Sequence, residues 1–383
     1  MSRFVPGETD VFVIGGGPAG LAAALAARQA GFDVMLADRA RPPIDKACGE
    51  GLMPDALDAL RRIGVNIGNE NGICFRGIRF LDEKLEAEAS FSNQGFGMGV
   101  RRTELHRVLV ERANQVGIVG LWGKKVSGLD SGGVHIDGRT VRCRWIVGAD
   151  GFHSSVRRWA GLAPDWNGAR RIGLRHHFRV RPWTDFVEVY WRKNCQAYVT
   201  PVGADEVCVA MVGTADIRGG DLTDMFPVLA SRLSGAELIG PTRGAISMSA
   251  RLPSVVAGKV ELVGDASGSV DAVTGEGLAL AFRQANSLAT ALAAGDLRRY
   301  DASHRRMGRM PRLMARTLLL FDGNDKLRRM AFRKLAAHPR IFSHMLAMHV
   351  GAGRRSTSTT IVKPPLRADI ERDGRRLPQN GLS

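Results

Sequence analysis

Apolar and polar residues follow two different periods along the chain. From Thr9, the apolar run 11–14 leads into a glycine turn, an alanine-rich stretch to about Ala30 and a second apolar run, 34–36. Short apolar runs bounded by turn residues are typical of buried strands, and alanine favours helix. This order predicts a strand–helix–strand unit that opens an α/β domain.

The middle of the chain changes to a period of two. Between about Gly173 and Gly213, apolar and polar residues alternate, which is the pattern of half-buried antiparallel strands. Further on, the apolar run 260–263 and an alanine-rich stretch after Gly277 return to the first pattern. We therefore expect the N-terminal domain to be discontinuous, with a mostly β domain inserted into it.

Composition and cysteine spacing limit the classes of protein to which the chain could belong. Its 44% hydrophobic and 24% charged residues are ordinary for a globular protein, and no run approaches the roughly 18 apolar residues of a membrane-spanning helix. The five cysteines are widely spaced without a Cys-x-x-Cys pair, so we expect neither disulfides nor a metal site. The first strand begins at about Asp10, too early to follow a secretory signal, and we expect a cytoplasmic protein.

Positive charge is concentrated in one segment. Lysine and arginine outnumber aspartate and glutamate by 54 to 38, and residues 298–340 alone hold 13 basic and 3 acidic side chains. No nucleic-acid motif accompanies this segment and aromatic residues are few, so nucleic acid is not the expected partner. Two interpretations stay open: peripheral association with an anionic membrane, at its inner face, or a solvated helical surface.

Three glycines follow the first predicted strand in the spacing Gly-x-Gly-x-x-Gly. Gly15 permits a tight turn, Gly17 lets the backbone approach a pyrophosphate, and Gly20 lets helix and strand pack closely. Asp38 ends the second strand, where its carboxylate can accept hydrogen bonds from a ribose diol. The run is a dinucleotide fingerprint, and its predicted contacts also include Pro18, Ala19 and Arg39.

Two later motifs indicate which dinucleotide the chain binds. Gly264-Asp265 is followed by Thr274-Gly275-Glu276-Gly277 at a helix start, and Ala149-Asp150-Gly151 precedes both. With the fingerprint, these motifs resemble those of the para-hydroxybenzoate hydroxylase-like flavoproteins. The resemblance covers nearly the whole chain and implies one non-covalently bound FAD. The positions that it assigns to FAD contacts are Arg102, Val126, Asp150, Gly151, Asp265, Gly275, Gly277 and Leu278.

The element pattern and the motifs together set the predicted organisation. We expect an α/β fold with a Rossmann-like, discontinuous FAD-binding domain, an antiparallel β-sheet substrate domain and a helical C-terminal region. The predicted boundaries are 9–60, 97–165 and 255–297 for the first domain, 61–96 and 166–254 for the second, 298–355 for the basic helical region and 356–383 for a disordered tail.

The segment Lys46-Ala47-Cys48-Gly49-Glu50-Gly51-Leu52 is the most distinctive. It resembles a segment of geranylgeranyl reductases and, more closely, the Cys-Gly-Glu-Gly of hydroxylases encoded beside type III polyketide synthases. Two interpretations of Cys48 stay open: a packing residue, or a residue over the flavin ring that lines the substrate pocket and contacts the cofactor. The resemblance favours His177 as a substrate-facing group, and Tyr198 is either a wall near the flavin or a half-buried sheet residue.

The resemblance leaves more than one function open. The first is a monooxygenase that uses FAD as cofactor and NAD(P)H as reductant to hydroxylate a lipophilic aromatic or polyketide-type substrate. The second is the reduction of isoprenoid double bonds, although the usual proline of that family is Ala272 here. A halogenase is disfavoured because its characteristic tryptophans are absent from 196–201, and no feature supports a non-catalytic flavin scaffold. We therefore predict the monooxygenase.

Overall fold

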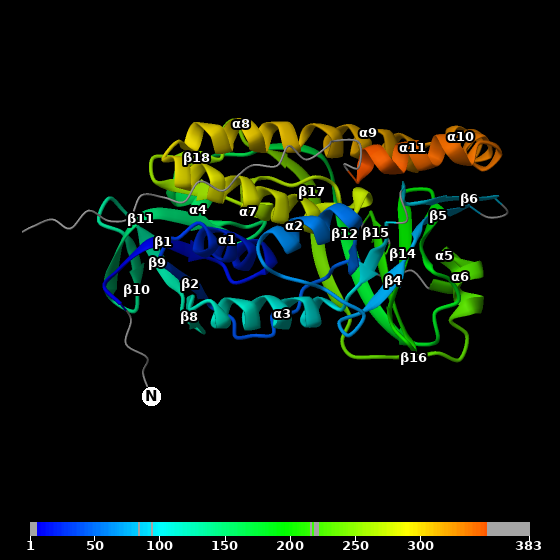
Figure 1. Cartoon of the computed structure of the whole chain (residues 1–383). Helices are drawn as coiled ribbons and strands as arrows, with labels where there is room; N and C mark the ends of the chain where they lie inside the picture. The colour runs from blue at the N-terminus through cyan, green and yellow to red at the C-terminus, as the bar shows by residue number, and fades with distance from the viewer. Residues whose placement is uncertain (1–5, 83–84, 93–94, 215–216, 218–221, 351–383) are drawn as a thin grey trace, which may run out of the picture.

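Two β-sheets lie side by side in the computed structural model, with helices along one edge of both (Figure 1). The structure describes residues 6–350 except 83–84, 93–94, 215–216 and 218–221. The tail predicted at 356–383 lies outside the described residues. No described helix is long and apolar enough to cross a membrane.

The first sheet is mainly parallel. Its strands run in the order β18-β19-β11-β1-β2-β8, and only the short β18 and the β9–β10 hairpin pair in antiparallel fashion. Val11, Phe12 and Val13 are fully buried, because a parallel strand is covered on both faces. The strands of this sheet and the helices that accompany them in the chain are β1 (Glu8–Ile14), α1 (Pro18–Gln29), β2 (Val34–Asp38), α3 (Arg102–Gln115), β8 (Val119–Trp122), β9 (Val126–Leu129), β10 (Val134–Ile136), β11 (Arg139–Gly148), α4 (Ser155–Trp159), β18 (Val256–Ala257) and β19 (Val260–Leu262).

The second sheet has the order β16-β12-β15-β14-β13-β5-β6, and β17 also pairs with β12. Its pairs are antiparallel as predicted, except that β5 is parallel to β13. A parallel pair needs a long crossover, and the chain between β5 and β13 supplies one by passing through the first sheet. The bounds are β5 (Gly77–Asp82), β6 (Leu85–Ser90), β12 (Asp165–Arg179), β13 (Phe186–Arg192), β14 (Cys195–Gly203), β15 (Glu206–Gly213), α5 (Leu222–Met225), α6 (Pro227–Arg232), β16 (Glu237–Leu238) and β17 (Arg243–Arg251).

A small third sheet has the order β3-β7-β4, and its strands β4 and β7 contact β14 of the second sheet. It consists of β3 (Gly51–Leu52), β4 (Ile73–Phe75) and β7 (Gly97–Gly99), and α2 (Pro54–Arg62) lies beside it. Residues 46–52, which we call the Cys48 segment, end in β3, so the pairing of β3 with β7 fixes one end of this segment.

The C-terminal helices lie along the upper edge of the molecule in Figure 1. Helix α8 lies over the first sheet, whereas α9, α10 and α11 lie over the second. These helices are α8 (Leu297–Met307), α9 (Arg309–Gly323), α10 (Asp325–Ala337) and α11 (Pro339–His349), and the preceding α7 (Gly277–Ala294) packs against α1 and α8. The arrangement agrees with the predicted α/β fold, its antiparallel second sheet and its helical C-terminal region.

Candidate active site

One elongated cavity of about 1520 Å³ connects the two large sheets. It begins at the carboxyl ends of β1 and β2, where the glycine turn leads into α1. It ends against the second sheet and the inner sides of α9 and α11. Ligands of α/β sheets bind outside the carboxyl ends of the strands, so the first half of the cavity lies where a nucleotide is expected.

The three glycines of the turn, Gly15, Gly17 and Gly20, have different surroundings. Gly15 has a φ of +113°, and a Cβ there would lie 2.3 Å from the carbonyl oxygen of Ala149. A Cβ on Gly20 would lie 1.8 Å from the carbonyl oxygen of Gly15, whereas a Cβ on Gly17 would meet no atom within 4 Å. Gly17 lines the cavity. The turn therefore exposes backbone at the N-terminus of α1, where N–H groups favour an anion such as pyrophosphate.

The carboxylate of Asp38 is fixed at the end of β2. Its Oδ2 accepts a hydrogen bond from the Gly16 N–H at 2.6 Å, and its Oδ1 accepts one from the Ala40 N–H at 2.7 Å. Because Asp38 lines the cavity, its remaining lone pairs can accept hydrogen bonds from a ribose.

His106 supports the glycine turn from α3 and was not predicted from the sequence. Its Nε2 donates to the Gly16 carbonyl oxygen at 2.9 Å, and burial lowers its pKa.

Arg102, at the start of α3, is a buried cation on the cavity wall. Its side chain is 9% exposed, and its Nε has no hydrogen-bond partner among the described residues. Leaving a buried donor unpaired costs about 1–3 kcal/mol, or more for a charged group. An anionic ligand in the cavity would remove this cost. The unpaired donor and the open backbone at Gly17 both fit the pyrophosphate of FAD.

The Asp150-Gly151 motif holds α4 in place. The Asp150 Oδ2 accepts hydrogen bonds from the backbone N–H groups of Ser155 at 2.6 Å and Val156 at 3.2 Å. Arg157 links this motif to the next one, since its guanidinium donates to the carbonyl oxygens of Phe152 and Ala266. The Asp150 carboxylate thus caps a helix while the residue itself lines the cavity.

The start of α7 points its backbone into the cavity. Gly275 has a φ of +68°, and the helix begins at Gly277, within the motif that was expected to start it. A Cβ on Gly277 would meet no atom within 4 Å. Nearby, Asp265 forms an ion pair with Lys46 at 3.1 Å, and both residues line the cavity. The positive end of the helix would stabilise negative charge on a reduced flavin.

Nearly all predicted cofactor residues line this one cavity. Gly20 is the exception, because it packs against Gly15 instead. The residues that line the cavity are Gly15, Gly17, Pro18, Ala19, Asp38, Arg39, Cys48, Arg102, Val126, Asp150, Gly151, Asp265, Gly275, Gly277 and Leu278. They come from distant parts of the sequence, so their convergence supports the inference that they hold one ligand.

A buried cluster of ionisable groups lies beside the start of α7. Glu276 Oε2 lies 3.6 Å from His349 Nδ1, and Arg283 Nη1 lies 3.7 Å from Asp55 Oδ2. Burial raises the pKa of Glu276 to about 8 and that of Asp55 to about 6, and it lowers the pKa of His349 to about 4. At neutral pH, Glu276 is therefore mostly protonated and His349 is neutral. Sequence reasoning did not find this cluster.

The Cys48 segment is anchored by Glu50, which the sequence analysis did not assign to the site. Glu50 is 2% exposed and has a φ of +59°. Its carboxylate accepts hydrogen bonds from the Arg102 N–H at 2.9 Å, the Arg175 Nη1 at 3.1 Å and the His177 Nε2 at 2.7 Å. Arg175 also reaches Asp45 at 2.8 Å. These bonds fix the segment against α3 and β12.

His177 does not occupy the position expected for a substrate-facing group. It is 2% exposed, is bonded to Glu50 and does not line the cavity; Arg175, two residues earlier on the same side of the strand, does line it. The side-chain atoms of Glu50, His177 and Cys208 that could coordinate a metal ion lie within 4.8 Å of one another. The Arg175 guanidinium already neutralises Glu50 there, so a cation would have to compete with it.

Cys48 and Tyr198 both line the cavity. The Cys48 Sγ accepts a hydrogen bond from the Glu50 N–H at 3.3 Å, and burial raises the pKa of the thiol. Since the reactive form of cysteine is the thiolate, this thiol is not activated as a nucleophile. Tyr198 donates its hydroxyl to the Val273 carbonyl oxygen at 2.7 Å. It therefore joins the second sheet to the segment that precedes α7.

The second half of the cavity is an apolar chamber. One wall is the second sheet, and the opposite wall is the inner sides of α9, α10 and α11. Sequence reasoning assigned no chamber residue to these helices. The main apolar residues that line the chamber are Phe80, Ile172, Leu174, Val187, Val189, Trp191, Met211, Met314, Leu318, Phe321, Leu335, Phe342, Met345 and Leu346.

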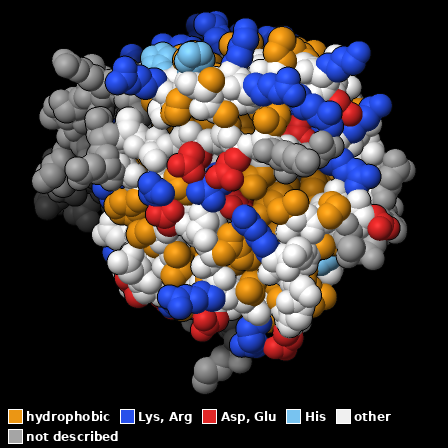
Figure 2. All heavy atoms as spheres, turned by 90° about the vertical axis from the view of Figure 1, so that its right-hand side faces the viewer, with side chains coloured by type: hydrophobic (Ala, Val, Ile, Leu, Met, Phe, Trp, Pro, Cys, Tyr) orange, Lys and Arg blue, Asp and Glu red, His pale blue; other side chains and the backbone are white. Residues whose placement is uncertain are grey.

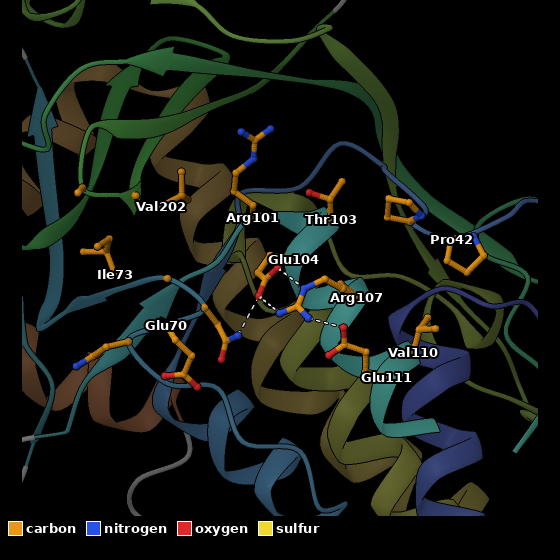
Figure 3. Close-up of a pocket in the computed structure, with 16 residues that line it drawn as sticks. Pro42, Glu70, Ile73, Arg101, Thr103, Glu104, Arg107, Val110, Glu111 and Val202 are labelled. Atoms are coloured by element: carbon orange, nitrogen blue, oxygen red, sulfur yellow. Dashed lines mark hydrogen bonds and ion pairs between the residues drawn. The ribbon is translucent and has the colours of Figure 1, made fainter. Parts of the chain in front are cut away.

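A separate pocket of about 880 Å³ lies on the outer side of α3. Figure 3 shows Glu104 and Glu111 turned toward Arg107 in this pocket. Because these charges already pair with one another, and because none of the predicted site residues lines it, the pocket offers no comparable arrangement for a cofactor.

Comparison with known proteins supports the same cofactor. Residues 8–201 match the model of the FAD binding domain. The chain is 28% identical over 323 residues to the menaquinone reductase of Mycolicibacterium smegmatis, covering 77% of this chain and 79% of that protein. It is 29% identical over 310 residues to digeranylgeranylglycerophospholipid reductase 2 of Methanopyrus kandleri, covering 71% and 73%.

Solved structures share the fold at low sequence identity. A flavoprotein/dehydrogenase from Cytophaga hutchinsonii has a TM-score of 0.78 at 20% identity, covering 90% of this chain and 93% of its own. The p-nitrophenol 4-monooxygenase of Pseudomonas putida has a TM-score of 0.77 at 17% identity, covering 92% and 100%. Because the family model matches half of the chain, this protein belongs to the FAD binding domain family and is an FAD-dependent oxidoreductase.

Proposed function

We propose that the protein is a monooxygenase that hydroxylates a lipophilic aromatic substrate, with NAD(P)H as the reductant. The observation that carries this proposal is the continuity of the cavity, in which the FAD half opens directly into an apolar chamber. Bound FAD would supply the electron transfer and the activation of oxygen. The reaction consumes substrate, O₂, NAD(P)H and a proton, and it yields hydroxylated substrate, water and NAD(P)⁺.

The chain's own residues would bind the cofactor and position the substrate. The turn at Gly15–Gly17 and the Asp38 carboxylate would hold the adenosine diphosphate, and Arg102 would contact its anionic part. The chamber walls would exclude water from the reacting atoms. Arg175 lines the cavity and is held there by Glu50 and Asp45, so its guanidinium would place positive charge near an oxygen atom on the aromatic head.

Reduction of isoprenoid double bonds is the second candidate. The relatives described as reductases of menaquinone and of a digeranylgeranyl lipid favour it. The same apolar chamber would accept a prenyl chain. In that reaction, FAD would deliver two electrons to the double bond and no oxygen would be consumed.

Oxygen dependence distinguishes the two candidates. The FAD-loaded enzyme is supplied with NADH or NADPH and a long-chain alkylresorcinol under ¹⁸O₂, and the products are analysed by mass spectrometry. Oxygen-dependent NAD(P)H consumption with one ¹⁸O atom in the product would support the monooxygenase. Saturation of a prenylated substrate by reduced enzyme without oxygen would support the reductase and overturn the first proposal.

A further inference from the structure

The three helices that cover the chamber expose an unusual number of large apolar side chains. Eleven large hydrophobic residues are exposed among the described residues, and five of them lie on α9, α10 and α11. Their exposed fractions range from 43% to 63%. These five residues are Leu313, Leu320, Met330, Ile341 and Met348.

The same outer sides are strongly basic. On α9 the exposed residues Arg309, Leu313, Arg316 and Leu320 recur every three or four positions, so basic and apolar side chains alternate along one helical face. Lys326, Arg333 and Lys334 on α10 and Arg340 on α11 are also exposed. Figure 2 shows basic and hydrophobic side chains along the upper edge of the molecule, where these helices lie.

Acidic residues do not balance this charge. The three helices contain two, Asp322 and Asp325. Asp322 is buried and faces Arg171 at 3.3 Å, and Asp325 pairs with Arg328 at 2.9 Å. Arg328 also turns inward, to Asp82 at 3.0 Å, and so does not belong to the outer surface. The outer sides of these helices thus carry a net positive charge.

The inner sides of the same helices form the chamber wall. On α9, Leu313 is exposed, whereas Met314, Leu318 and Phe321 line the chamber. The α9, α10 and α11 helices also contact one another, so they form one layer. A single layer of helices, about 10 Å thick, therefore separates the chamber from the outer surface. We call this layer the roof.

We propose that the outer side of the roof docks on an anionic lipid bilayer and that the substrate passes from the bilayer into the chamber at this roof. The inference rests on the lipophilic substrate of the proposed function. Exposed apolar side chains between cations match a helix that lies in the interface of an anionic membrane. A second copy of the chain is a poorer occupant, because it would bring two positively charged surfaces together.

Vesicle sedimentation tests the docking directly. Purified FAD-loaded protein is mixed with vesicles of phosphatidylcholine alone or of phosphatidylcholine with about 30% phosphatidylglycerol, at low and at high salt. We expect sedimentation only with the anionic vesicles and release by salt, because screening shortens the reach of the charges to about 8–10 Å or less. Equal behaviour with both kinds of vesicle at low salt would overturn the proposal.

Charge reversal on the roof gives a sharper test. The double variant Arg316→Glu/Arg333→Glu should lower the partition coefficient at least about 25-fold, because each cation near the surface contributes about fivefold. The matched control, Arg139→Glu/Arg181→Glu, makes the same change in net charge at exposed residues outside the roof and outside the basic segment 298–340, and should sediment like the parent. Equal loss in both variants would mean that overall charge, and not the roof, causes binding.

Two further measurements distinguish a failure of the docking proposal from a failure of the proposed function. Leu313→Glu/Leu320→Glu should also lose sedimentation, while turnover of a short-chain, water-soluble substrate without vesicles should stay unchanged. If sedimentation follows this pattern but no hydroxylation is found, only the proposed function fails. If the roof variants instead abolish self-association in analytical ultracentrifugation and leave vesicle binding intact, the surface is a contact between copies and the docking proposal is wrong.

Discussion

Glu50→Gln should destabilise the fold by about 2–4 kcal/mol, because the Glu50 carboxylate is a buried anion that holds three elements together. Removing one partner of a buried ion pair costs about 3–5 kcal/mol, and the glutamine oxygen recovers part of this by accepting one of the original hydrogen bonds. Arg175, which is 2% exposed, would keep only Asp45 as its anionic partner. Glu50→Ala should cost more, because it leaves every donor without its acceptor.

The backbone at Glu50 allows a second comparison. Its φ of +59° is a left-handed conformation that costs a residue with a Cβ about 1–2 kcal/mol. Glu50→Gly and Glu50→Ala remove the same carboxylate, but only glycine adopts this conformation without strain. Glu50→Gly should therefore be more stable than Glu50→Ala by about 1 kcal/mol.

Urea unfolding of the FAD-loaded protein, followed by tryptophan fluorescence and by flavin release, measures these differences. The matched control is Glu237→Gln, which breaks a 2.8 Å ion pair with Arg179 whose side chains are both more than 60% exposed. Surface pairs contribute about 0–1 kcal/mol, so the control should stay close to the parent. If Glu50→Gln costs no more than Glu237→Gln, the buried carboxylate does not hold the Cys48 segment and the reasoning is refuted.

Three more predictions follow from the cavity and its charges. Asp38→Ala should weaken FAD binding by about 1.5–3 kcal/mol with the fold intact; equal retention of FAD in an equilibrium titration would exclude a ribose contact. Cys48→Phe should impair turnover while FAD stays bound, and normal kinetics would make Cys48 a packing residue. Because burial raises the pKa of Glu276 from 4.5 to about 8, the folded state holds the proton more tightly, and the free energy of unfolding should fall as the pH rises through this window. Glu276→Gln should flatten that fall, and an unchanged profile in urea titrations would contradict the assignment.

Local patterns in the sequence predicted residues that the structure brings together along one half of the cavity. The turn at Gly15 to Gly20 and the strand end at Asp38 lie within one continuous segment, and their spacing follows from the geometry of a strand, a turn and a helix. The later motifs at Asp150 and Asp265 were assigned by their resemblance to the para-hydroxybenzoate hydroxylase-like flavoproteins. Each is a short run at the end of a strand, and parallel strands bring their carboxyl ends to one edge of the sheet.

Features that depend on contacts between distant segments could not be predicted in this way. Glu50 meets Arg175 across 125 residues, and no local periodicity marks such a pair. His177 was expected to face the substrate, but Glu50 holds it in a buried position. On α9, Leu313 and Leu318 are equally apolar in the sequence, and only packing against the chamber decides that the first is exposed and the second is not.

The source of the substrate determines which contacts can select it. A chain that moves from water into an apolar site gains about 0.8 kcal/mol per buried CH₂ group, but a chain that moves from a bilayer leaves one apolar medium for another and gains little. If the substrate enters at the roof, the apolar chamber therefore accommodates the chain without discriminating strongly among chain lengths. Selection then falls on the polar head, whose desolvation must be offset by hydrogen bonds. The Arg175 guanidinium on the cavity wall would provide positive charge for that role, whereas Leu318 and Phe342 provide only apolar contact. If the substrate enters at the roof, its selection therefore depends on the cavity wall beside the Cys48 segment, whereas the apolar chamber under the roof sets only the space for the chain.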